Sequence, residues 1–233
     1  MVIDARSRKI EAARVALEEV RNGMTLGLGT GSTATELVTL LGSAYRKGEI
    51  ENIRATCTSV RTEELARSFG IPLHSLEELA PLDLAIDGAD EIDGNLRLIK
   101  GLGGALLREK IVEQAAARFI VIADESKLVD RLGRGVLPVE VVVFAWKHLE
   151  RSFGGLGLSP KLRLENGKEY VTDEGHRILD VKIPGGTDIA DLVDELKDLA
   201  GVVETGFFPR EATEAIIATA EGVQRMVRKD SKP

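Results

Sequence analysis

Short apolar runs alternate with helix-like segments over the first half of the chain. The apolar runs have the length of strands and lie at 24–29, 53–57, 71–76, 82–87, 96–101 and 119–124. Three intervening segments repeat apolar residues at helical spacing, at 34–44, 61–69 and 105–117. This alternation is typical of a mostly parallel sheet with helices on both faces. We therefore expect an α/β fold with a Rossmann-like lobe.

The pattern changes after Gly135 to strand, helix, two strands, helix and strand. The expected strands are 137–144, 160–165, 177–183 and 201–206, and the expected helices are 145–153 and 189–201. This order is the ferredoxin-like arrangement. We predict a smaller ferredoxin-like α+β domain at 134–206 and a Rossmann-like catalytic domain at 1–133 plus 207–233. The segment 211–227 is expected to return to the larger domain as a helix.

Composition excludes several classes of protein. The 233 residues are 43% hydrophobic and 30% charged, which is typical of a globular chain. A net charge of −7 with only 4% aromatic residues disfavours a nucleic-acid binder. No apolar run approaches the roughly 18 residues of a membrane span. The single Cys57 excludes an internal disulfide and suits a reducing compartment. We expect a cytoplasmic protein with neither nucleic-acid nor membrane partners.

A glycine-rich loop at 29–34 follows the first strand and fits the dinucleotide pattern G-x-G-x-x-A. The next strand, however, ends in Cys57-Thr58-Ser59 and lacks the acid that would bind a ribose. Hydroxyls and backbone N–H groups at a helix N-terminus instead suit the phosphate of a small molecule. The residues concerned are Thr30, Gly31, Ser32 and Thr33. The alternative is that Ser32 or Thr33 only caps the helix.

Asp87 and Asp90 stand directly beyond an apolar strand, where ligands bind in open α/β sheets. Gly88 and Ala89 separate them, so a tight turn directs both carboxylates to one place. Two close carboxylates repel each other, which raises the pKa of one and makes it an acid. The alternative is a solvated acidic turn, and we prefer it only for Glu91 and Asp93.

Lys100 ends the next strand-like run, and bare backbone follows it. The loop residues are Gly101, Leu102, Gly103 and Gly104. Accessible N–H groups with a lysine can hold a developing oxyanion. In the following helix, Glu109 shares a face with small apolar residues, and burial would make it a better base near neutrality. The helix alone equally allows a surface glutamate paired with Arg108 or Lys110.

Lys127 lies just beyond the strand at 119–124, within reach of a phosphate or a sugar hydroxyl, although a lone surface lysine is the simpler interpretation. Lys9 on the first helix is similar. His74, His148 and His176 have no ligand spacing, so no metal site is indicated.

Taken together, the motifs resemble the ribose-5-phosphate isomerase type A family over nearly the whole chain. The matching segments are GLGTGSTA, DGADEID, KGLGGALLREKI, IADESK, LPVEVV, VTDEG and GVVETGFF, in the family's order. Two positions depart from the usual pattern, with His176 in place of an asparagine and Leu102 among the glycines.

The resemblance implies a function and roles for these residues. It implies Glu109 as the general base, with Asp87, Asp90 and Lys100 lining the sugar site. We expect Asp87 and Lys100 to be catalytic as well: Asp87 would assist ring opening by proton transfer, and Lys100 would stabilise the enediolate. Asp90 would orient sugar hydroxyls or Lys100. Substrate-binding positions would be Lys9, 30–33, 88–89, 101–103 and Lys127. It also implies no metal and no cofactor, and a homodimer or homotetramer.

The expected activity is interconversion of D-ribose 5-phosphate and D-ribulose 5-phosphate through a cis-enediolate. The alternatives are a non-catalytic sugar-phosphate sensor, or a sugar-phosphate deaminase or CoA enzyme on the same scaffold.

Overall fold

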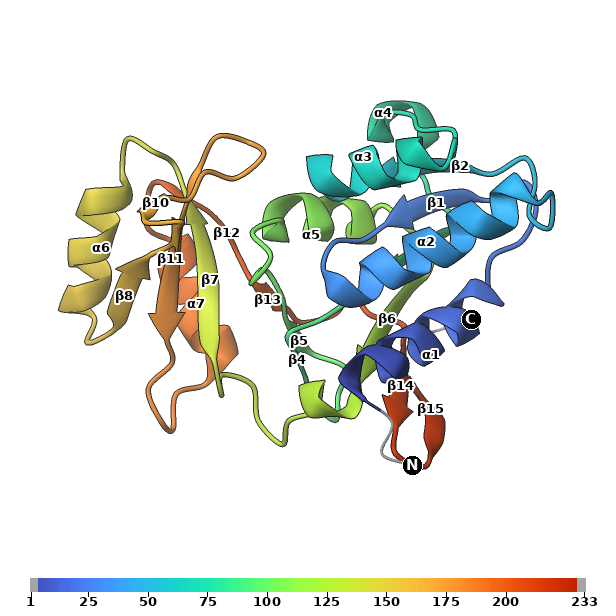
Figure 1. Ribbon diagram of the computed structural model, residues 1–233. Helices are drawn as coiled ribbons and strands as arrows, with labels where there is room; N and C mark the ends of the chain where they lie inside the picture. The colour runs from blue at the N-terminus through green and yellow to red at the C-terminus, as the bar shows by residue number, and fades with distance from the viewer. Residues whose placement is uncertain (1–3, 230–233) are drawn as a thin grey trace.

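The computed structural model describes residues 4–229, which form two lobes (Figure 1). The larger lobe contains a six-stranded sheet in the order β15-β14-β6-β3-β1-β2. Its strands are β1 (Thr25–Leu28), β2 (Arg54–Cys57), β3 (Leu84–Asp87), β6 (Phe119–Asp124), β14 (Glu214–Thr219) and β15 (Gly222–Val227). All neighbours are parallel except β14 and β15. The predicted α/β class is confirmed.

Helices cover both faces of this sheet because its strands are apolar on both sides. The helices are α1 (Ala5–Leu17), α2 (Ser32–Arg46), α3 (Val60–Ser68), α4 (Leu76–Leu79) and α5 (Leu106–Gln114). Along β6, Ile120 and Ile122 join the core beneath α1 and α2, while Phe119 and Val121 join the core on the other face. Alternate side chains of a strand point to opposite faces, so one short strand serves two cores.

The smaller lobe has the predicted ferredoxin-like order. Its elements are β7 (Val136–Val141), α6 (Trp146–Gly155), β8 (Ser159–Leu162), β11 (Arg177–Lys182), α7 (Ile189–Lys197) and β12 (Val202–Thr205). They form an antiparallel sheet in the order β12-β7-β11-β8. A two-stranded hairpin, β9 (Leu164–Glu165) and β10 (Lys168–Glu169), is inserted before β11.

A small sheet lies where the lobes meet (Figure 1). It consists of β4 (Glu91–Ile92), β5 (Leu98–Ile99) and β13 (Phe207–Phe208). Lys100 follows β5 directly, so this sheet carries it toward the carboxyl ends of the main strands. The domain limits at 134 and 206 stay a prediction.

Two predicted elements are wrong. The segment 211–227 is not a helix but the hairpin β14–β15, because β14 pairs along its length with β6 and completes the buried sheet. Tertiary pairing here overrides the helix propensity of its alanines and glutamates. The run 71–76 is not a strand, since only Leu73 makes a bridge, to Ala55, before α4 begins. The first helix, α1, ends at Leu17.

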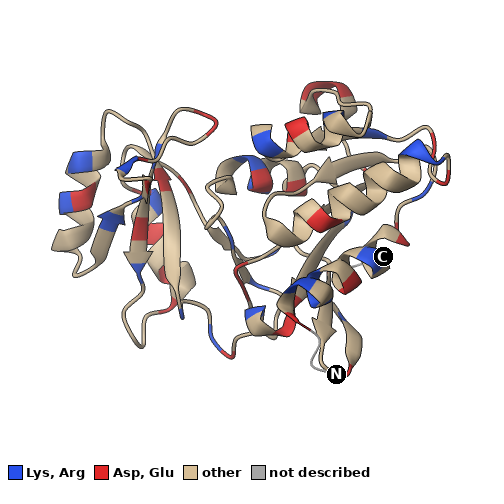
Figure 2. Ribbon diagram, in the orientation of Figure 1, with Lys and Arg blue, Asp and Glu red and all other residues tan. Residues whose placement is uncertain are grey.

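Basic and acidic residues are interspersed along the ribbon of both lobes (Figure 2). Within residues 4–229, no helix is both long and apolar enough to cross a membrane.

Candidate active site

The carboxyl ends of β1, β3 and β6 open onto one cavity of about 80 Å³. Such strand ends are where ligands bind in open α/β sheets. The cavity collects nearly all the predicted substrate-binding positions. Its lining residues are Thr30, Gly31, Ser32, Thr33, Gly88, Ala89, Asp90, Lys100, Gly101, Gly103, Glu109 and Lys127. Of the predicted residues, Asp87, Leu102 and Lys9 are outside this lining.

The glycine-rich loop ends at an uncapped helix. Gly31 is the N-cap of α2, with φ of 104°, and no side chain accepts a hydrogen bond from the first turn. The prediction that Ser32 or Thr33 caps the helix is therefore wrong. Lys9 Nζ donates to Ser32 Oγ at 3.0 Å, which places the lysine ammonium at this end of α2. Free N–H groups, a helix dipole and a lysine together form an anion-binding environment.

The Thr30 hydroxyl holds the loop in place and does not face a ligand. Its Oγ1 lies 2.7 Å from Thr58 Oγ1 and 2.7 Å from Ser59 Oγ, and 3.2 Å from Thr62 Oγ1. This buried hydroxyl cluster was not predicted, although Thr58 and Ser59 stand at the end of β2, beside the loop that follows β1.

Asp87 lies directly beneath the loop. Its Oδ1 accepts hydrogen bonds from the N–H groups of Thr30 at 2.9 Å and Gly88 at 2.6 Å. A Cβ at Gly29 would lie 2.1 Å from this carboxylate, so glycine is what permits the approach. Asp87 is only 1% exposed, with one oxygen bound to backbone and the other paired with Lys100. The carboxylate therefore supports the site and does not line it.

Lys100 is a buried ammonium among carboxylates. Its Nζ donates to Gly88 O at 2.6 Å and forms ion pairs with Asp87 Oδ2 at 2.9 Å and Glu113 Oε1 at 3.0 Å. Glu109 Oε2 lies 3.9 Å away. Burial alone would lower the pKa of Lys100, but the charges of Asp87, Glu109 and Glu113 outweigh it and raise that pKa. Lys100 therefore remains positive.

Glu109 is 4% exposed, and its Oε2 has no hydrogen-bond donor within the described residues. Burial raises its pKa to about 8; Lys100 opposes this shift, and the charges of Asp87 and Asp90 add to it. Glu109 is thus neither a surface glutamate nor paired with its sequence neighbours, and the buried alternative for this residue is confirmed. Another face of the same helix is open to solvent, since Ile111 is 46% exposed.

Glu113 is an acid that sequence reasoning missed. It is 2% exposed, and burial raises its pKa well above the usual range, against the pull of Lys100. Its position four residues after Glu109, on the same face of α5, was the available signal. Three carboxylates face one ammonium in this desolvated cluster, which disfavours the ionisation of all three and raises the pKa of both glutamates.

Asp90 fixes the second glycine loop. Its Oδ2 accepts the Leu102 N–H at 2.9 Å, and burial raises its pKa. The Leu102 side chain is 52% exposed and points outside the cavity, so only its backbone belongs to the site. In residues 4–229, no group of three His, Cys, Asp or Glu side chains is arranged to hold a metal ion.

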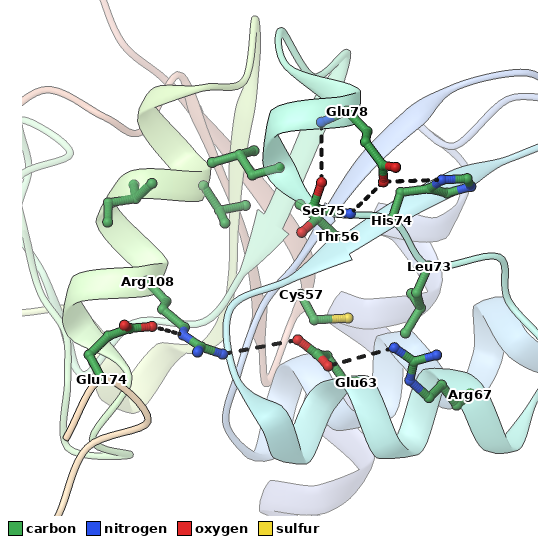
Figure 3. A pocket seen from close by; sticks show the side chains of 13 residues that line it. Thr56, Cys57, Glu63, Arg67, Leu73, His74, Ser75, Glu78, Arg108 and Glu174 are labelled. Carbon is green, nitrogen blue, oxygen red and sulfur yellow. Dashed lines mark hydrogen bonds and ion pairs between the residues drawn. The ribbon is translucent and has the colours of Figure 1, made fainter.

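A larger hollow, of about 520 Å³, lies between α3, α4 and α5 (Figure 3). Two arginines at this hollow are paired with glutamates: Arg108 with Glu174 at 2.6 Å and Arg67 with Glu63 at 3.9 Å. The His74 ring lies 3.6 Å from Glu78. Cys57 at its wall is buried, and burial raises the pKa of its thiol to about 12. The smaller cavity is the one that combines a buried ion cluster with an uncapped helix N-terminus.

Comparison with known proteins identifies the family to which this chain belongs. The profile of the family described as ribose 5-phosphate isomerase A (phosphoriboisomerase A) matches residues 54–222. The chain belongs to the ribose 5-phosphate isomerase A family. The ribose-5-phosphate isomerase A of Sinorhizobium medicae is 50% identical over 230 residues, covering 96% of this chain and 99% of that one. That of Synechococcus sp. is 51% identical over 221 residues, covering 94% and 96%.

Solved isomerases of the family share the whole fold. A D-ribose-5-phosphate isomerase in complex with phospho-erythronic acid has a TM-score of 0.92 at 40% identity, covering 97% of this chain and all of the other. The Plasmodium falciparum ribose 5-phosphate isomerase also has a TM-score of 0.92, at 36% identity, covering 96% and 99%. The resemblance stated from the motifs is therefore confirmed over both lobes.

Proposed function

We propose that this protein interconverts D-ribose 5-phosphate and D-ribulose 5-phosphate by proton transfer through a cis-enediolate. The observation that carries the proposal is Glu109, a buried carboxylate with a free oxygen and a pKa raised to about 8, beside the fixed charge of Lys100. A base works best when its pKa is near the working pH. Family membership supplies the substrate.

The reaction begins at the carbon next to the sugar's carbonyl. Glu109 removes the proton from C2 of the open-chain aldose, and the electron pair forms the enediolate with the negative charge on O1. The proton of the O2 hydroxyl passes to O1, so the negative charge moves to O2. Glu109 then returns its proton to C1 as the carbonyl re-forms at C2. A buried glutamate serves this kind of exchange because the same group acts as base and then as acid.

Lys100 and the loop at 101–103 would stabilise the enediolate. Lys100 already has three oxygens within 3.0 Å of Nζ, so its contribution is chiefly the field of a buried positive charge. Direct hydrogen bonds come from backbone N–H groups of the loop.

Asp87 is better suited to hold Lys100 than to open the sugar ring, because both its oxygens are occupied and it is outside the cavity lining. Asp90 lines the cavity and is the carboxylate that we assign to the sugar hydroxyls.

The phosphate would rest on the N-terminus of α2, at 31–33, with Lys9 and Lys127 as cations. This end of the substrate is remote from the chemistry. Binding of the phosphate places C2 against Glu109. The binding energy offsets the entropic cost of this orientation and so raises kcat.

Proton NMR of ribose 5-phosphate with the purified protein, in D₂O with EDTA, tests the proposal. We expect ribulose 5-phosphate to form with deuterium entering C1 and C2. Line broadening on binding without turnover would instead establish a sensor, and activity only on amino sugar phosphates or CoA thioesters would establish another enzyme. Loss of turnover with EDTA would overturn the prediction of a metal-free reaction.

The proposal includes a homodimer or homotetramer in the cytoplasm. In the smaller lobe the adjacent apolar residues Val143 and Phe144 are exposed, Phe144 fully, and we assign them to the contact between copies. Light scattering on a sizing column tests this, and a monomer at micromolar concentration would contradict it.

A further inference from the structure

Arg163 of the smaller lobe contacts the candidate active site. It lies between β8 and β9, and its Nη1 donates to Gly101 O at 2.6 Å and to Leu102 O at 3.2 Å. These carbonyls belong to the loop that follows Lys100. An arginine from the other lobe therefore binds the backbone of the loop that faces the sugar cavity.

Asp180 fixes the orientation of this arginine. Arg163 Nε donates to Asp180 Oδ2 at 3.0 Å, and its Nη2 donates to Oδ1 of the same carboxylate. A bidentate pair of this kind sets the plane of the guanidinium as well as its position. The Arg163 side chain is 11% exposed, so its remaining donor Nη1 is directed at the loop and little of it reaches solvent.

Because Arg163 fixes two carbonyls of the loop, it also fixes the directions of the N–H groups in the same two peptides. A trans peptide is planar, and its C=O and N–H point in opposite directions. Gly101 O shares a peptide with the Leu102 N–H, which points away from Arg163 and donates to Asp90. Leu102 O shares a peptide with the Gly103 N–H, which has no acceptor within the described residues, and Gly103 lines the cavity.

A second contact braces the end of the same loop. Gly104 has φ of 83°, and a Cβ there would lie 2.0 Å from the hydroxyl oxygen of Tyr170. The Gly104 N–H donates to Gly101 O at 3.0 Å and closes the turn. Successive N–H groups on one side of such a turn form a concave site for negative charge.

We propose that Arg163, oriented by Asp180, is a positioning residue of the isomerase: it holds two carbonyls of the 101–104 loop so that the Gly103 N–H faces the enediolate. The inference rests on the proposed function. It assigns the smaller lobe a part in stabilising the transition state, with no contact to substrate.

Steady-state kinetics of Arg163→Gln test the assignment, with Arg177→Gln as the matched control. Arg177 lies in the same lobe, is 16% exposed and donates to Glu169 at 3.0 Å, so its loss removes a similar ion pair away from the loop. For Arg163→Gln we expect kcat to fall about 30-fold, short of the 10²–10³-fold cost of deleting an oxyanion donor. KM should stay within about threefold, and Arg163→Lys should be intermediate because it keeps one donor.

Ligand affinity separates positioning from a structural effect. Phospho-erythronic acid, with which a solved isomerase of the family forms a complex, carries a carboxylate whose two oxygens and negative charge resemble those of an enediolate. We therefore expect Arg163→Gln to weaken its binding by the same factor as kcat. Binding of inorganic phosphate, which needs only the N-terminus of α2, should be unchanged. A structural defect would weaken both ligands.

Three outcomes are decisive. Wild-type protein without turnover would overturn the proposed function itself. Wild-type turnover with Arg163→Gln kinetics equal to those of Arg177→Gln, or with a loss carried by KM alone, would overturn only the inference. Should Arg163→Gln fail to fold, Asp180→Asn decides: kcat reduced about fivefold with phosphate binding intact supports the assignment, and unchanged kcat overturns it.

Discussion

Glu109 and Glu113 are two buried glutamates on one helix that touch the same lysine but face different surroundings. Glu109 lines the cavity, whereas Glu113 lies 3.0 Å from Lys100 and outside the cavity lining. Glu109→Gln should lower kcat by about 10²–10⁴-fold, the usual contribution of a general base. Glu113→Gln should stay within about threefold, because glutamine resembles the protonated acid. Equal losses in the two variants would remove Glu109 from the role of base.

The raised pKa of Glu109 predicts the pH dependence of the reaction. The base must be ionised, so kcat/KM should rise with pH along a limb centred near 8. Because the carboxylates interact, this limb belongs to the cluster as well as to Glu109. A pH–rate profile between pH 5 and 10 checks it, with circular dichroism as the control for folding. A limb centred below about pH 6 would contradict the assignment.

The same pKa shift predicts a cost in stability. Folded Glu109 keeps its proton up to about pH 8, whereas the unfolded chain releases it near 4.5. The unfolded state therefore binds fewer protons between these values, and stability falls as pH rises through that window. Glu109→Gln should have a higher Tm than the wild type at pH 8, and the difference in Tm should be smaller at pH 4. Each kcal/mol of stability corresponds to about 2–4 °C in Tm for a protein of this size. Calorimetry at the two pH values measures this, and a lower Tm for the variant at pH 8 would contradict it.

At the scale of elements, the N-terminus of α2 is a stable helix end without a cap. A negative charge at this position interacts favourably with the helix dipole, but it occupies the place of the phosphate. Ser32→Asp should therefore leave Tm unchanged or slightly raised while KM increases by at least about 10-fold. Ser32→Asn, which has the size of aspartate without its charge, is the control and should raise KM far less. An unchanged KM in Ser32→Asp would place the phosphate elsewhere.

Several elements of the site could be predicted because strand ends are visible in the sequence. Asp87 and Lys127 stand beyond apolar runs that became β3 and β6, and parallel strands bring such ends to one edge. Glu113 was within reach, since helical periodicity relates it to Glu109. Arg163 was not, because its contact with Gly101 joins residues 62 apart from two different lobes. The hairpin at 214–227 was missed because pairing with β6, and no local preference, decides its structure.

At the scale of the whole molecule, the smaller lobe has its own apolar core. That core is formed mainly by residues of β7, α6, β11 and α7, including Val139, Phe153, Leu179 and Leu196. We expect the fragment 134–206 to fold alone, with a cooperative thermal transition by circular dichroism. Its stability should be reduced, because Ile99, Leu132 and Phe207 of the same core lie outside the fragment. A non-cooperative transition would show that the predicted domain limits do not define an autonomous unit.

The outward Leu102 side chain has a practical consequence. Arg163 and Asp90 hold this position only through its carbonyl and N–H, so a replacement side chain changes neither contact. The chain's one cysteine is buried, and burial raises the pKa of its thiol to about 12, which leaves it unreactive toward alkylating reagents. Leu102→Cys would thus be a selective attachment point for a fluorophore, a reporter placed on the catalytic loop that needs no other change to the protein.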